Sequence, residues 1–151
     1  MPSQSSHPSA SQTGWHRPER WQPHLALGIT GHRASNPSFC AHGAAIGAAL
    51  TALFTRIETI AGSLPGARGT PRLHSLLVDG TDQIAADLAL ARGWELVVPL
   101  PFGADLNLAI NAHPETTADA AALCRGKPAA DPAVEARAAA IRDITARAHL
   151  F

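Results

Sequence analysis

The 151-residue sequence predicts an α/β protein, a Rossmann-like three-layer unit with helices flanking a short parallel sheet of about three strands. Three observations support this prediction. Apolar runs and helical periodicities alternate in the order strand, helix, strand, helix, strand, which favours parallel pairing with right-handed crossovers. The apolar runs are continuous, as is typical of strands covered on both faces. Hydrophobic residues make up 46% of the chain, an ordinary fraction for a folded domain of this length.

The N-terminal segment is expected to lie outside this domain. It is rich in Ser, Gln, Pro and His and has no apolar period, so it buries too little surface to offset the entropy lost on ordering. We therefore predict a disordered tail over residues 1–23, a Rossmann-like core over residues 24–106 and a helical C-terminal segment over residues 107–151.

The first strand and first helix have clear boundaries in the sequence. An apolar run over residues 24–30 ends at Gly31, as a buried strand does. Asn36 followed by Pro37 marks a helix start, with an N-cap residue before a proline at the first helical position. The apolar residues that follow recur at helical spacing along one face, and Gly62 ends the helix.

Two more strands and a short helix complete the expected core. A strand is expected over residues 73–78, a helix over residues 84–91 with Gly93 as its C-cap, and a third strand over residues 94–100.

The signal weakens beyond residue 104. Residues 107–124 are rich in alanine, and a last helix is expected from Asp131-Pro132 to about residue 149. No fourth strand is predicted.

Composition excludes several classes of protein. The 12 basic and 12 acidic residues cancel, so the basic field of a protein that binds duplex nucleic acid is missing. Cys40 and Cys124 form no CxxC pair, which favours a reducing, cytoplasmic location. The sequence has no signal-peptide layout and no long uninterrupted apolar run, so no membrane association is expected. The histidines show no metal-ligand spacing, and neither a metal nor a cofactor is expected.

The loop after the first strand carries the residues of an anion site. Thr30 offers a hydroxyl, Gly31 permits a sharp turn and close approach of a ligand to the main chain, and Arg33 offers a planar fork suited to phosphate. The helix that follows is expected to direct its N–H groups and its dipole toward the same place. His32 is either a proton carrier or a packing residue. The sequence therefore predicts a phosphate-binding loop.

The loop after the second strand is expected at the same edge of the sheet. Gly80 again permits close approach, and Thr81 could face the same ligand. Asp79 could accept a hydrogen bond from a ribose hydroxyl or bind Thr30 or Arg33 instead.

More ordinary interpretations of both loops stay open. The first loop is neither a Walker A motif nor GxGxxG. Its glycines could merely relieve crowding, with Arg33 in solvent, and Thr81 or Asp82 could simply cap the short helix.

Four segments, taken in order, resemble a known family. They are Leu27–Arg33 (LGITGHR), Val78–Asp82 (VDGTD), Arg92–Leu96 (RGWEL) and Pro99–Phe102 (PLPF) with Asp105. This combination resembles the SLOG superfamily of Smf/DprA and LOG (lysine-decarboxylase-like) proteins, and most closely a bacterial branch of it. The resemblance implies a Rossmann-like fold that binds nucleotides or nucleotide-derived ligands, often as a sensor in signalling or defence. It places Gly31, His32 and Arg33 in the first phosphate-side loop, and Gly80, Thr81 and Asp82 in the second.

The sequence also departs from that family. Its members continue into a fourth strand and a Gly-Gly-Thr loop, joined in LOG enzymes by a catalytic Glu, whereas this sequence ends at Leu150-Phe151. Asp79 stands where relatives commonly have Glu or a small residue, and the Tyr usual near Asp105 is missing. The resemblance thus implies a C-terminal truncation, with a homodimer or a completing partner chain as alternatives for the open sheet edge.

The expected function is binding of a small-molecule nucleotide or nucleotide-derived phosphate ligand as a sensory or regulatory module. One alternative is a LOG-like N-glycosidase acting on nucleoside monophosphates, for which only Asp79 or Asp82 is placed to act at the sugar. The other is a remnant without independent activity.

Overall fold

The computed structural model describes residues 22–66 and 69–150 of the chain. Within these residues it has five helices and a sheet of parallel strands, so the predicted α/β class with an open parallel sheet is confirmed. The tail predicted over residues 1–23 lies outside the described residues, apart from Gln22 and Pro23.

The first strand leads into the longest helix. β1 is Ala26–Gly28 and α1 is Pro37–Ser63. The predicted cap is present, since the Asn36 side chain accepts a hydrogen bond from the Ser38 N–H and Pro37 occupies the first helical position. α1 buries one face, made of Leu50, Phe54 and Ala61.

The next three elements are shorter strands than predicted and a longer helix. They are β2 (Arg72–His74), α2 (Thr81–Ala91) and β3 (Glu95–Val98). β2 ends early because the chain turns after Ser75, where Leu77 adopts a φ of 54°. α2 begins at Thr81, directly after Gly80, so the second candidate loop runs into the helix.

The C-terminal part forms three helices and a short strand. They are α3 (Ala104–Asn111), α4 (Thr117–Leu123), α5 (Pro132–Thr145) and β4 (His149–Leu150). α5 starts as predicted, because the Asp131 side chain accepts from the Ala133 and Val134 N–H groups. β4 corrects the prediction that no fourth strand is present: it pairs in parallel with β3, and a strand of two residues is too short to produce an apolar run. The predicted boundary at residue 106 falls within α3.

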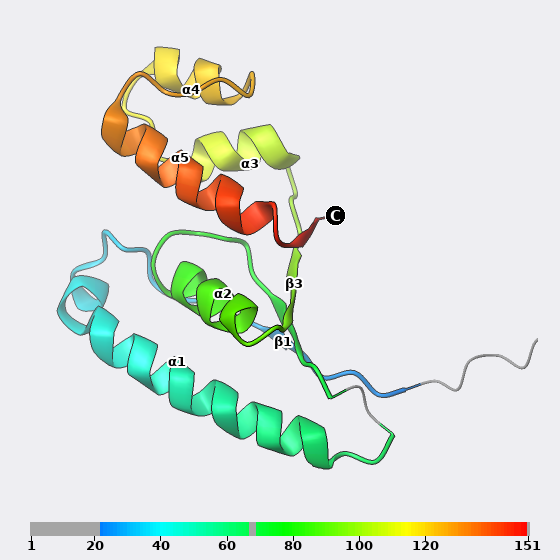
Figure 1. Ribbon diagram of the computed structural model, residues 1–151. Coiled ribbons are helices and arrows are strands. Elements are labelled where there is room, and N and C mark those ends of the chain that lie inside the picture. The colour runs from blue at the N-terminus through cyan, green and yellow to red at the C-terminus, as the bar shows by residue number, and fades with distance from the viewer. Residues whose placement is uncertain (1–21, 67–68, 151) are drawn as a thin grey trace, which may run out of the picture.

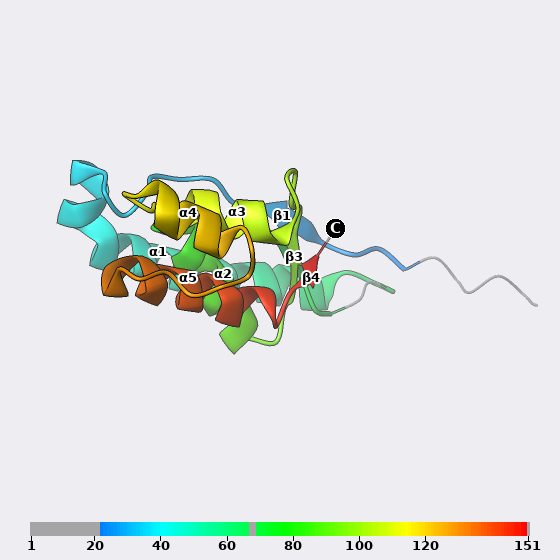
Figure 2. The ribbon, with the colours of Figure 1, turned by 90° about the horizontal axis from the view of Figure 1, so that it is seen from above.

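The sheet has the order β1-β2-β3-β4 with every pair parallel. Figures 1 and 2 show the helices gathered beside the short strands. The strand order also contains no reversal, the place where open sheets usually bind ligands.

Burial along the strands differs between β2 and β3. Leu73 and Leu96 are 1% exposed and pack against the helices. On β2, Arg72 and His74 on either side of Leu73 are half-buried, and Arg72 Nη2 lies 2.6 Å from Glu95 Oε2. On β3, Leu96, Val97 and Val98 are all buried, so the continuous burial predicted from the apolar run is present there and not on β2.

Two hydrophobic clusters hold the helices. The first lies under the sheet and includes the stacked rings of Phe54 and Trp94, whose centroids are 4.5 Å apart. The second joins α3, α4 and α5 around Leu123 and Ala138, both fully buried. Each fully buried leucine contributes about 1.5–3 kcal/mol, so the short strands are stabilised mainly by the helices that cover them.

Among the described helices, α1 is long and apolar enough to cross a membrane by length and composition alone. That is weak evidence, and α1 is also anchored in the fold. Trp94 Nε1 donates to Glu58 Oε1 at 2.8 Å, and Phe54 packs in the core. The absence of membrane association stays a prediction.

Candidate functional site

The two predicted loops are in direct contact at the carboxyl edge of the sheet. The Thr81 N–H donates to the His32 carbonyl oxygen at 3.1 Å, and the Thr81 hydroxyl donates to the same oxygen at 3.3 Å. A Cβ atom on Gly31 would lie 2.5 Å from Thr81 Cβ, and one on Gly80 would collide with the His32 carbonyl. Both glycines therefore serve loop packing, because the space beside them is filled by the opposite loop.

Main-chain N–H groups without acceptors among the described residues lie in the first loop. Among the described residues, no acceptor receives the N–H groups of Thr30, Gly31, His32 or Arg33. Thr30, Gly31 and His32 are all exposed. These four groups are free to donate to a bound anion.

The first loop leads directly into the start of α1. The Asn36 N–H donates to the Arg33 carbonyl at 3.0 Å, and the Asn36 side chain accepts from the Ser38 N–H at the first turn of the helix. That the α1 dipole supports anion binding at this loop stays a prediction.

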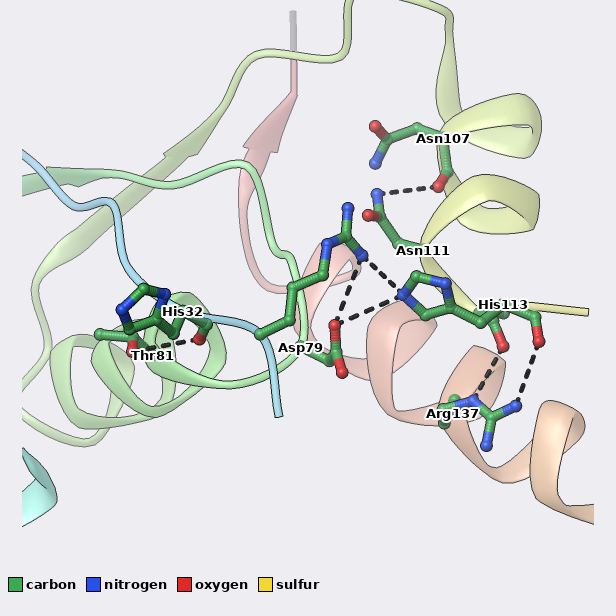
Figure 3. Close-up of polar contacts among 9 residues, drawn as sticks. His32, Asp79, Thr81, Asn107, Asn111, His113 and Arg137 are labelled. Carbon is green, nitrogen blue, oxygen red and sulfur yellow. Dashed lines mark hydrogen bonds and ion pairs between the residues drawn. The ribbon is translucent and has the colours of Figure 1, made fainter. Parts of the chain in front are cut away.

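Arg33 lies in a cluster that the sequence did not reveal. Its Nη1 donates to His113 Nε2 at 2.6 Å and lies 3.5 Å from Asp79 Oδ1, which is also 3.5 Å from His113 Nε2 (Figure 3). The hydrogen bond requires His113 to be neutral at Nε2. The Arg33 side chain is 40% exposed. Of the two alternatives for Asp79, the ion pair with Arg33 is the one formed.

His113 follows α3 and is held by α5. Arg137 Nε donates to the Ala112 carbonyl at 2.8 Å, and its Nη2 donates to the His113 carbonyl at 3.3 Å. His113 has a φ of 51°, an uncommon conformation for a residue other than glycine. Eighty positions separate it from Arg33, so no local pattern could have paired the two.

Two acidic side chains beside Arg33 are poorly solvated. Asp79 Oδ1 is buried and has no hydrogen-bond partner among the described residues, so the Arg33 guanidinium 3.5 Å away compensates its charge, and the neutral His113 ring does not. Asp82 is 6% exposed, and this burial raises the pKa of its carboxyl, an effect that the Arg33 charge partly opposes.

Buried amides extend this polar region onto α3. Asn107 and Asn111 are 6% and 3% exposed. Asn111 Nδ2 donates to the Asn107 carbonyl at 3.0 Å, whereas the side-chain amide of Asn107 bonds to no described residue. Figure 3 shows both amides projecting from the same side of α3. Buried amides are normally paired, so the Asn107 amide is available to a ligand.

The structure thus brings most of the predicted site residues together. The two loops pack against each other through Gly31, His32, Gly80 and Thr81. The charged side chain of Arg33 interacts with the carboxylates of Asp79 and Asp82. Thr30 is exposed and its hydroxyl bonds to no residue that the structure describes. No three metal-ligating side chains cluster in residues 22–66 and 69–150.

Comparison of the chain with protein-family models, with curated proteins and with solved structures finds no match.

Proposed function

We propose that this protein binds a small phosphate-bearing ligand, a nucleotide or a nucleotide-derived molecule, at the carboxyl edge of its sheet, as a cytoplasmic sensory or regulatory module. One observation carries the proposal: a half-exposed guanidinium, that of Arg33, stands on the same short loop as four main-chain N–H groups without acceptors. Charged and main-chain donors of this kind are what phosphate recognition requires.

The unused donors of Arg33 support this assignment. Only Nη1 contacts the protein, through His113 and Asp79. Nε and Nη2 donate to no described residue, and together they form the edge of the fork that binds two oxygens at once. The Asp79 contact holds the guanidinium in place and partly neutralises it, which suits a reversibly bound ligand.

Isothermal titration calorimetry with inorganic phosphate, pyrophosphate and adenosine 5′-monophosphate tests the proposal. Loss of a charge-assisted contact costs about 1.5–3 kcal/mol, so Arg33→Ala is expected to weaken binding by roughly ten- to a hundredfold. Arg56→Ala is the matched control, because Arg56 is exposed on α1 and forms no ion pair with a described residue.

Two results would overturn the proposal. One is the failure of all three probes to bind. The other is unchanged binding in Arg33→Ala together with a loss of stability, which would make Arg33 a structural link between the first loop and His113.

A second function, hydrolysis of the N-glycosidic bond of a nucleoside monophosphate, is favoured by one observation. A carboxyl whose pKa burial raises can hold a proton for a leaving group, and Asp82 is such a group. Chromatography would detect free base released from the monophosphate, and Asp82→Asn should abolish this release. Absence of release by the unaltered protein excludes this second function and leaves the first intact.

A further inference from the structure

A cavity next to the candidate site has no role in phosphate binding. It has a volume of about 250 Å³ and lies between α3, α5 and the turn at Gly126. Its apolar walls are Leu100, Leu108 and Ile141, and its polar lining includes Asp105, Asn107 and Arg142. We propose that it binds an amino-bearing base of the adenine type. This inference rests on the proposed nucleotide-binding function.

Asn107 connects the cavity with the candidate site. It lines the cavity, is 6% exposed, and its amide bonds to no described residue. Its neighbour one helical turn later, Asn111, projects from the same face of α3 (Figure 3). His113 follows the same helix and accepts from Arg33 Nη1, so a ligand whose phosphate binds at Arg33 lies beside the end of α3, and its base can extend along the helix to Asn107.

The chemistry of the lining fits a flat ring with polar edges. Leucine and isoleucine side chains pack against the faces of such a ring, whereas a carboxamide offers one donor and one acceptor side by side. Asparagine pairs in this way with the edge of adenine that carries the amino group. Asp105 offers a further acceptor for an amino group or a ribose hydroxyl. Arg142 is held by Glu135, with 2.7 Å between Nη1 and Oε1.

The size of the cavity limits the ligand. Pockets for drug-sized molecules occupy about 300–1,000 Å³, so 250 Å³ suits a single base and not a dinucleotide. The ligand expected from both sites together is a mononucleotide with an amino-bearing base.

The test compares three probes by calorimetry: adenosine 5′-monophosphate, inosine 5′-monophosphate, which lacks the amino group, and ribose 5-phosphate, which lacks the base. The adenine nucleotide is expected to bind at least tenfold more tightly than ribose 5-phosphate, with the inosine nucleotide between them. Asn107→Leu should reduce the tenfold ratio to less than threefold.

A second variant fills the cavity without removing a polar group. Ala104→Leu, at the first position of α3, should also abolish the preference for the base, because Ala104 lines the cavity. Ala118→Leu is the matched control, since Ala118 is exposed in the first turn of α4 and does not line the cavity. This control should keep the full ratio.

The outcomes separate this inference from the proposed function. Equal binding of adenosine 5′-monophosphate and ribose 5-phosphate, or an unchanged ratio in Ala104→Leu, overturns the base site while phosphate binding stands. If no phosphate probe binds, the proposed function fails, and titration with adenosine then decides the cavity alone. Adenosine binding that Ala104→Leu abolishes supports the base site, and its absence in the unaltered protein overturns it.

Discussion

The core under the sheet and the carboxyl edge of the sheet bury their side chains in opposite ways. In the core, buried residues are apolar and closely packed, as in the stacked pair of Phe54 and Trp94. At the edge, Asp82, Asn107 and Asn111 are almost as deeply buried but polar, and Asp79 Oδ1 is a buried oxygen without a hydrogen-bond partner among the described residues. Truncating apolar side chains in the core should therefore lower the free energy of unfolding. Replacing polar side chains at the edge by apolar ones of similar size should not lower it.

This difference indicates that the core residues serve stability and the polar edge residues serve another purpose. Burying an unpaired polar group costs about 1–3 kcal/mol, so a chain selected only for stability would replace such groups by apolar ones. Polar groups retained at one edge of a sheet, beside exposed N–H groups, indicate a place where a ligand supplies the missing partners.

The largest effect is expected in the core. Phe54→Ala should lower the free energy of unfolding by about 4 kcal/mol, because it leaves a cavity and removes the ring stacked on Trp94. Urea denaturation followed by circular dichroism measures this loss. Leu53→Ala, at an adjacent position that is 51% exposed, should cost less than about 0.5 kcal/mol. Equal losses in the two variants would refute the assignment of this core.

Gly80→Ala should be the most damaging single change at the edge. Gly80 has a φ of 99°, and an added Cβ would also lie 2.7 Å from the Ala34 amide nitrogen. Strain and crowding together should cost about 3 kcal/mol. Gly93→Ala is the control, since its φ is 72° with no atom near the added Cβ, and it should cost about 1 kcal/mol by the same denaturation.

Asp82→Asn should show a pH-dependent gain. Burial raises the pKa of Asp82 above its ordinary 3.8, so the folded protein holds this proton more tightly than the unfolded chain does. This carboxyl favours folding most below pH 3.8, and its contribution falls as the pH rises through the raised value. The variant should therefore be more stable than the unaltered protein at pH 7, and this gain should shrink as the pH falls toward 3.8.

Asp119→Asn provides the opposite case. Hydrogen bonds from the Ala130 N–H and the Thr116 hydroxyl lower the pKa of Asp119 below 3.8, so its stabilisation is present at neutral pH and lost as the pH falls through the lowered value. This variant should be destabilised at pH 7 and less so in acid. Parallel pH profiles for Asp82→Asn and Asp119→Asn would contradict both assignments.

The smallest effect is expected for Asn107→Leu. Replacing a side-chain amide that bonds to no described residue by an apolar side chain should change the free energy of unfolding by less than about 1 kcal/mol, or increase it. Thermal unfolding measures this change. A loss of 2 kcal/mol or more would show that the amide is paired in the folded protein and is not free for a ligand.

Local signals predicted the helices well. The Asn36-Pro37 and Asp131-Pro132 pairs gave the starts of α1 and α5, because a cap depends on a few neighbouring residues. β4 was not predictable in this way, because its pairing with β3 depends on a contact between distant parts of the chain.

The candidate site was only half visible in the sequence. Glycines and charged residues after two strands marked both loops, and parallel strands bring such loops to one edge. His113 and the asparagines of α3 lack such a mark, because only the packing of α3 beside the sheet edge gives them a role. The glycines, expected to face a ligand, face each other's loops instead.

That close packing of the two loops has a mechanical consequence. Neither Gly31 nor Gly80 leaves space for a methyl group, so the two loops are closely packed against each other. We therefore expect them to move together as one rigid unit. One loop continues into α1 and the other into α2. A shift of the Arg33 backbone is therefore expected to move the first turn of α2 as well.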